Sequence, residues 1–142
     1  MNPYVIRFTI ANAVLTVALA ILAEMLKLKS GSGLAAGCAI ASSFFAAAAF
    51  AKDHSREPTS AEKSAFAWRA VLATWLVSLV LAGMFLAVFS SAAEVRGILG
   101  VLKSGSMLAL MVGTLLFVSA IYYLGIRWSF GWYARLAASR AR

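Results

Sequence analysis

The chain has few of the residues that carry out enzyme chemistry. It contains one cysteine, Cys38, one histidine, His54, and five acidic residues. A single cysteine excludes a disulfide within the chain and a thiol redox pair. The sequence shows no cluster with metal-ligand spacing, no Gly-rich phosphate loop after a strand pattern, and no base to activate a serine in an apolar segment. We therefore expect a protein that is not an enzyme, with no catalytic residues, no metal and no cofactor.

Charge is also scarce. Charged residues make up 13% of the chain, 63% of the residues are hydrophobic, and the mean hydropathy is +0.88. Soluble domains carry about 25% charged residues, so lipid is the expected solvent for most of this chain. The net charge of +8 is divided among the ends of the apolar segments and forms no continuous basic face. A bilayer with anionic headgroups is therefore the expected partner, and nucleic acid is not.

Four apolar segments follow one another along the chain, at about 5–26, 34–51, 65–89 and 107–126. Each is close to or above the roughly 20 residues that a helix needs to cross a bilayer. A hydrophilic loop over 52–64 separates the second from the third, and a basic, aromatic tail over 127–142 follows the fourth. These features predict an all-α membrane protein, a four-helix bundle of two hairpins forming a single transmembrane domain over residues 1–142.

The basic residues predict an orientation. Four crossings put the N-terminus, the loop and the tail on one side of the membrane. The other side holds only Lys27, Lys29, Arg96 and Lys103 of the 13 basic residues. Because basic residues concentrate on the cytoplasmic side, both termini are expected in the cytoplasm.

Polar residues follow one face of the first segment. Their spacing along a helix aligns Thr9, Asn12, Thr16 and Glu24. Polar groups in lipid find partners inside the bundle, so hydrogen bonding between helices is the simpler interpretation. The alternative is a polar path for a proton or cation lined by Asn12, Thr16 and Glu24.

Small residues recur at four-residue spacing in the other three segments. Such rows let helix backbones approach closely, and they lead us to expect that the second helix is the most enclosed. The rows are Gly33, Gly37 and Ala41; Ala35, Ala39, Ser43 and Ala47; Ala70, Thr74, Ser78 and Ala82; and Gly105, Ala109 and Gly113.

The loop carries the clearest local motif. Pro58 cannot continue the preceding helix, and Thr59 with Glu62 has the spacing of a capping box. A helix is therefore predicted to begin at about Ser60, in water. The charges of the loop itself, such as Asp53 beside Lys52, are interpreted as a solvated mixture or, alternatively, a docking surface for a cytoplasmic partner.

The tail combines tryptophans with arginines, as segments at headgroup depth do. We interpret it as an interfacial anchor. The candidate lipid-headgroup contacts are Arg127, Trp128, Trp132, Arg135 and Arg140.

One stretch is repeated. Residues 28–35 and 102–109 read LKSGSGLA and LKSGSMLA, and both precede the second helix of a predicted hairpin. Similar turn chemistry explains the match, and duplication of a hairpin is the alternative.

The layout resembles a known family. Four apolar segments in a short chain, Arg7-Phe8, the central Arg56-Glu57-Pro58-Thr59-x-x-Glu62 motif and an aromatic, Arg-rich end are similar to the ABZJ family of small bacterial inner-membrane proteins. The resemblance implies a four-helix fold and a location in the bacterial inner membrane, and it supplies no site residues. We expect a non-enzymatic accessory or interaction component with a second copy or another membrane protein as partner. The alternative is a small oligomeric transporter.

Overall fold

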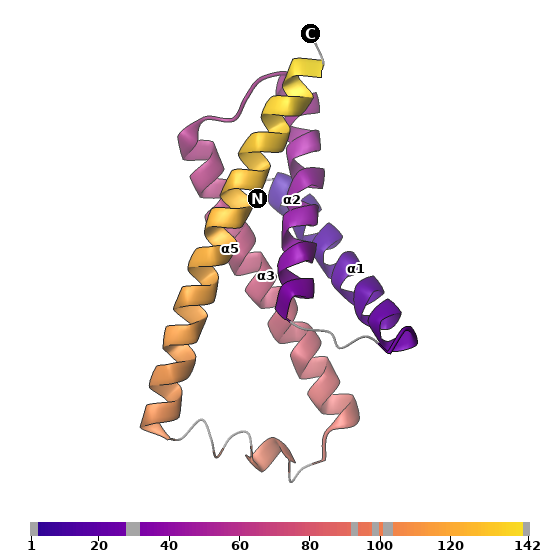
Figure 1. Cartoon of the computed structure of the whole chain (residues 1–142), viewed down its shortest axis with the longest axis vertical. Helices are drawn as coiled ribbons and strands as arrows, with labels where there is room; N and C mark the ends of the chain where they lie inside the picture. Colours follow the sequence, from indigo (N-terminus) through magenta and orange to yellow (C-terminus); the bar gives the residue numbers. More distant parts are fainter. Residues whose placement is uncertain (1–2, 28–31, 92–93, 98–99, 101–103, 141–142) are drawn as a thin grey trace.

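Four long helices make up nearly all of the computed structural model (Figure 1), which describes residues 3–27, 32–91, 94–97, 100 and 104–140. They are α1 (Pro3–Met25), α2 (Ser32–His54), α3 (Ser60–Phe89) and α5 (Gly105–Arg140). One further helical turn covers 94–97, and no strand occurs in these ranges. The all-α fold class is confirmed.

The helices pack as a ring of neighbours. The main contacts of α1 are with α2 and α3, and those of α5 are with the same two helices. The start of α1, the end of α2, the start of α3 and the end of α5 lie together (Figure 1). We call this the loop end, because residues 52–64 lie there, and the opposite end, with Phe89 and Gly105, the open end. Toward the open end α3 and α5 diverge (Figure 1).

An aromatic cluster holds the loop end together. Each helix contributes one buried phenylalanine: Phe8, Phe50, Phe66 and Phe130. The Phe66 and Phe130 rings stack with centroids 4.1 Å apart, while Phe8 meets Phe66 and Phe50 meets Phe130 edge-on at 5.8 Å. Such pairs contribute about 0.5–1.5 kcal/mol beyond the burial of their area. The core of the protein therefore sits near the loop end, where all four helices meet.

Small residues in α2 allow the closest approach. Ala39, Ser43 and Ala47 are fully buried, and Ser43 shares a hydrogen bond with Ser129 of α5. Of the four helices, α2 has the largest buried share of its most apolar stretch, 44%. The expected enclosure of this helix is therefore confirmed. Ala35, in the same row but nearer the open end, is exposed.

The other small-residue rows are used only toward the loop end. Ala70 and Thr74 are buried in α3, whereas Ser78 and Ala82 are exposed. The rows at the open end are exposed or half-buried, and a Cβ added at any of their glycines would meet nothing within 4 Å. They are Gly33, Gly37 and Ala41 in α2, and Gly105, Ala109 and Gly113 in α5.

Helix α5 is longer than the sequence suggested. It continues to Arg140 instead of ending near 126, so residues 127–140 are not a separate tail. A buried row at four-residue spacing, Ile126, Phe130, Ala134 and Ala138, joins this part to the bundle. The helix has 36 residues. At about 1.5 Å per residue, its length is greater than the thickness of a hydrocarbon core.

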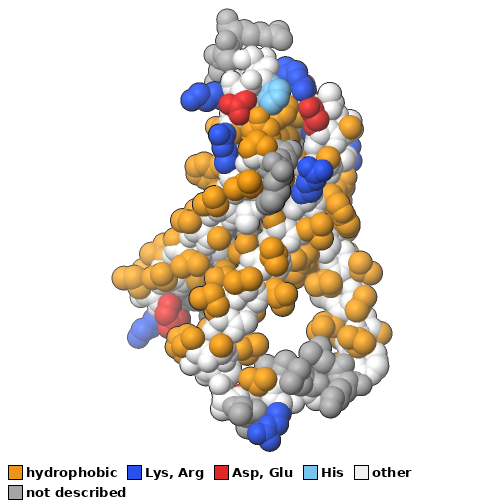
Figure 2. All heavy atoms as spheres, turned by 180° about the vertical axis from the view of Figure 1, so that it is seen from behind, with side chains coloured by type: hydrophobic (Ala, Val, Ile, Leu, Met, Phe, Trp, Pro, Cys, Tyr) orange, Lys and Arg blue, Asp and Glu red, His pale blue; other side chains and the backbone are white. Residues whose placement is uncertain are grey.

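The outer surface is strongly apolar away from the loop end (Figure 2). Large side chains with more than two thirds of their surface exposed include Leu79, Val88, Phe89, Leu110 and Phe117. A soluble monomer rarely exposes so continuous an apolar surface. Each of the four helices is long enough and apolar enough to cross a membrane.

The repeated stretch lies partly outside the described residues, at 28–31 and 102–103. In the described part, α2 begins at Ser32 and α5 begins at Gly105. Both copies therefore stand at the start of a helix, as expected of turn chemistry and of a duplicated hairpin alike.

Candidate functional site

The predicted capping box is present and fixes the start of α3. The Glu62 backbone N–H donates to Thr59 Oγ1 at 3.3 Å, and the Thr59 N–H donates to Glu62 Oε2 at 2.7 Å. Arg56 binds the same carboxylate with both terminal nitrogens, at 2.9 and 2.8 Å. These contacts fold the loop back onto the first turn of α3.

Glu57 joins the loop to two helices. Its Oε1 accepts from Lys63 Nζ of α3 at 2.8 Å and from Arg135 Nη2 of α5 at 2.9 Å. Lys63 and then Arg135 hold the pKa of Glu57 at about 2, well below its usual range, because their hydrogen bonds favour the charged carboxylate. Within 52–64, Arg56 pairs with Glu62 and Lys63 pairs with Glu57, and Arg135 adds a contact from α5. Apart from Lys63 these side chains are exposed, as expected of a solvated mixture, and the docking surface stays a prediction.

Asp53 makes the corresponding tie to α1. Its Oδ2 accepts from the Tyr4 hydroxyl at 3.0 Å and lies 3.8 Å from Arg7 Nη1. His54 stacks on Phe50, with ring centroids 4.5 Å apart. The described residues hold no group of three or more side chains that could bind a metal ion. The contacts of Asp53 therefore join the end of α2 to the start of α1.

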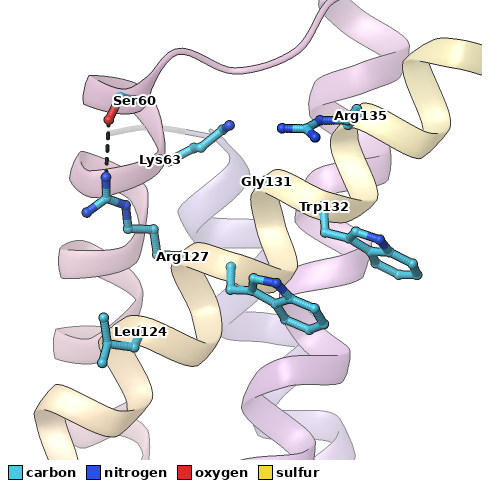
Figure 3. A pocket seen from close by; sticks show the side chains of 8 residues that line it. Ser60, Lys63, Leu124, Arg127, Gly131, Trp132 and Arg135 are labelled. Carbon is cyan, nitrogen blue, oxygen red and sulfur yellow. Dashed lines mark hydrogen bonds between the residues drawn. The ribbon is translucent and has the colours of Figure 1, made fainter.

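A cavity of about 460 Å³ opens between the first turn of α3 and the second half of α5 (Figure 3). We call it the basic cavity. It is lined by Ser60, Lys63, Leu124, Arg127, Trp128, Gly131, Trp132 and Arg135.

Three cations meet at the basic cavity. Lys63 and Arg135 point toward each other across it (Figure 3), and Arg127 Nη2 donates to Ser60 Oγ at 3.1 Å. Lys63 and Arg135 share the single carboxylate of Glu57, and Arg127 has no carboxylate partner among the described residues. The cavity therefore keeps a surplus of positive charge.

The position of Lys63 depends on a glycine. A Cβ built at Gly131 would lie 3.1 Å from Cδ and Cε of Lys63, which is tighter than an ordinary contact. The lysine stem lies against the α5 backbone, and its side chain is only 19% exposed. A bare backbone at 131 thus lets a cation of α3 reach the surface of α5.

The two tryptophans border the same cavity. The rings of Trp128 and Trp132 stack with centroids 5.9 Å apart and 8° between their planes, and their residues are 66% and 49% exposed. Large exposed indoles beside cations are typical of headgroup depth, where one side of the ring is apolar and the other wet. The arrangement suits an amphipathic ligand.

The structure brings together four of the five predicted headgroup contacts: Arg127, Trp128, Trp132 and Arg135. The side chain of Arg140 lies outside the described residues. Sequence reasoning missed Ser60 and Lys63, which come from another helix. The signal was available, because the predicted topology puts the start of α3 and the end of α5 on the same side of the membrane.

The polar residues of α1 do not form one site. Asn12 is buried and its Oδ1 has no hydrogen-bond partner among the described residues, Thr16 is half-buried and Glu24 is exposed. Thr9 donates within its own helix, to the Val5 carbonyl at 2.7 Å. Because a helix rises about 1.5 Å per residue, Asn12 and Glu24 stand about 18 Å apart along α1.

No family model, curated protein or solved structure matched the chain. The resemblance to the ABZJ family therefore stays a prediction. The fold defines the class of protein: an all-helical chain with four helices long and apolar enough to cross a membrane.

Proposed function

We propose that the chain spans the bacterial inner membrane four times, with the loop end in the cytoplasm. The start of α1, the end of α5 and residues 52–64 lie at that end (Figure 1). These segments carry most of the basic residues, and basic residues favour the cytoplasmic side. Single-cysteine variants, made in a chain that carries Cys38→Ala, test the placement. Ser55→Cys should react with a membrane-impermeant maleimide only after the cells are opened, whereas Gly97→Cys should react in intact cells. The reverse pattern would contradict it.

Within the membrane, we propose a non-enzymatic interaction component that pairs with a second copy of itself. The observation that carries this function is the contrast between the two ends of the small-residue rows. Toward the loop end the rows are buried between helices, whereas Gly105, Ala109 and Gly113 of α5 are exposed, with nothing within 4 Å of an added Cβ at either glycine. Rows of this kind are sites of helix association in lipid.

A second copy is the simplest occupant of this surface. Gly105 and Gly113 are about 12 Å apart along α5, so two backbones could stay close for more than two turns. If each copy presents the same row to the other, the contact closes as a two-fold dimer.

Oligomeric state in lipid nanodiscs or a mild detergent tests the pairing. Gly113→Leu should shift the protein from dimer to monomer, because a leucine holds the two backbones apart. Met111→Phe, which adds bulk about halfway round α5, is the matched control and should leave the dimer in place. A wild-type protein that is monomeric at every concentration in lipid would contradict the proposal.

A small oligomeric permeation unit is the second candidate. It is favoured by Oδ1 of Asn12, a buried polar atom inside the bundle that has no hydrogen-bond partner among the described residues. Proton or potassium flux into vesicles measures this activity. Flux in the wild type that falls in both Asn12→Leu and Glu24→Gln would support a path along α1, and flux indifferent to both would exclude it.

A further inference from the structure

A second cavity continues the basic cavity toward the open end. It has a volume of about 660 Å³ and also lies between α3 and α5. We call it the apolar cavity, since most of its lining surface is carbon. Its lining residues are Ser64, Ala65 and Trp68 of α3 and Leu116, Ser119, Ala120 and Tyr123 of α5.

The linings of the two cavities adjoin along both helices, with Lys63 next to Ser64 in α3 and Leu124 next to Tyr123 in α5. On α5 a row at four-residue spacing lines first the apolar and then the basic cavity: Leu116, Ala120, Leu124, Trp128 and Trp132. On α3 the row Ser60, Ser64 and Trp68 does the same in the opposite direction. Residues four apart share one side of a helix. The groove therefore follows one side of the α3–α5 contact, basic at the loop end and apolar farther in.

The length of the groove corresponds to one leaflet. Leu116 and Trp132 are about 24 Å apart along α5, and half of a bilayer with its headgroups is about 20 Å. In the proposed orientation the cations lie at headgroup depth and the apolar cavity lies within the acyl chains. Charge and hydropathy thus change along the groove in the same order as in a phospholipid.

We propose that this groove binds one anionic phospholipid. The phosphate lies in the basic cavity, with Arg127 as its main donor, and an acyl chain follows the apolar cavity past Trp68. Arginine is suited to this role because its fork of N–H groups matches phosphate oxygens. The surplus charge beside Glu57 selects an anionic lipid over a zwitterionic one.

A defined lipid site differs from non-specific contact with the surrounding headgroups because its cations are held in place by the protein. Lys63 is mostly covered and lies against Gly131. The Arg135 side chain is 70% exposed, but its guanidinium is held by the ion pair with Glu57. Cations fixed in this way form a site with one geometry, whereas freely exposed side chains would favour any nearby phosphate. The proposal rests on the membrane placement above and is independent of the dimer.

Lipid retention by the full-length protein tests the site. The protein is purified in mild detergent, mixed with equal amounts of phosphatidylglycerol and phosphatidylcholine, and examined by native mass spectrometry. We expect one phosphatidylglycerol per chain, bound at least several-fold more tightly than phosphatidylcholine. Equal retention of the two lipids, or many lipids without a preferred number, would overturn the proposal.

Arg127→Gln is the decisive variant, since Arg127 makes its described side-chain hydrogen bond to Ser60 and not to the loop carboxylate. Its affinity for phosphatidylglycerol should fall about tenfold or more, the usual weight of a hydrogen bond to a charged group. Arg69→Gln removes an exposed cation of the same region of α3 that lines neither cavity, and it should leave binding unchanged. Equal losses in both variants would indicate a general headgroup layer and refute a defined site.

A third variant separates a lipid from a free anion. Ala120→Trp fills the apolar cavity and should weaken phosphatidylglycerol binding severalfold, although the basic cavity stays intact. Inorganic phosphate at millimolar concentration should not displace the lipid. If phosphate displaces it and Ala120→Trp has no effect, the site binds a soluble anion and the lipid proposal is wrong. A chain found in the membrane fraction that retains no lipid selectively refutes this inference and leaves the membrane placement standing.

Discussion

Glu57 and Arg135 stand 78 residues apart in the chain and lie 2.9 Å apart between carboxylate oxygen and guanidinium nitrogen. Lys63 binds the same oxygen at 2.8 Å. One carboxylate of the loop therefore fixes the last part of α5 against the first turn of α3. The basic cavity lies between these two helix segments, so its shape depends on this junction.

Acid should weaken this junction. The pKa of Glu57 is lowered to about 2, so the carboxylate stabilises the fold fully above the unfolded pKa of about 4.3, and its contribution is lost as the pH falls from there toward 2. Carbon-13 NMR of the glutamate carboxyl groups in micelles should show the low pKa. Lys63→Gln and Arg135→Gln should each raise it. A Glu57 that titrates at its ordinary value in the wild type would rule out the junction.

Removal of the cap should destabilise the start of α3 locally. Thr59→Ala loses the hydroxyl that accepts from the Glu62 N–H, and such a loss costs about 1 kcal/mol. Amide hydrogen exchange should become faster at residues 60–62, and Thr59→Ser, which keeps the hydroxyl, should restore most of the protection. Unchanged exchange in Thr59→Ala would contradict a stabilising cap.

Local features were predictable from the sequence, and the capping box shows why. Thr59 and Glu62 are three residues apart, so their contact depends only on local backbone geometry. A second pair with the same spacing, Ser91 and Glu94, also makes reciprocal bonds, at 2.7 and 3.3 Å. Glycines at 97 and 100 follow this pair closely, so the sequence around it resembles a connection more than the start of a long helix.

Contacts between helices could not be read from the sequence in the same way. The phenylalanine cluster and the junction at Glu57 depend on where four helices cross, which the periodicity of one segment does not determine. The end of α5 carries both kinds of signal. Trp128 and Trp132 indicate a membrane interface, whereas the buried row through Phe130 and Ala134 indicates a packed helix. The tryptophan pattern led to the prediction of a separate tail, although the row at four-residue spacing was present in the same segment.

Bulk in the α2 row should destabilise the bundle according to position. Ala39 is fully buried, so Ala39→Leu should lower the free energy of unfolding by about 1–3 kcal/mol, the usual cost of overpacking. Ala35, in the same row but exposed, gives the matched control, and Ala35→Leu should be tolerated. Thermal unfolding in one detergent compares the two. Equal losses would show that the row is packed along its whole length.

The buried amide of Asn12 gives the last prediction. Its Oδ1 has no hydrogen-bond partner among the described residues, and an unsatisfied buried group costs about 1–3 kcal/mol. Asn12→Leu has a similar size without the polar atoms, so it should stabilise the monomer by about 1 kcal/mol in unfolding experiments. Thr16→Val, one turn farther along the same face, controls for a general gain from apolar substitution. A loss of stability in Asn12→Leu, with Thr16→Val neutral, would contradict an unsatisfied amide at this position.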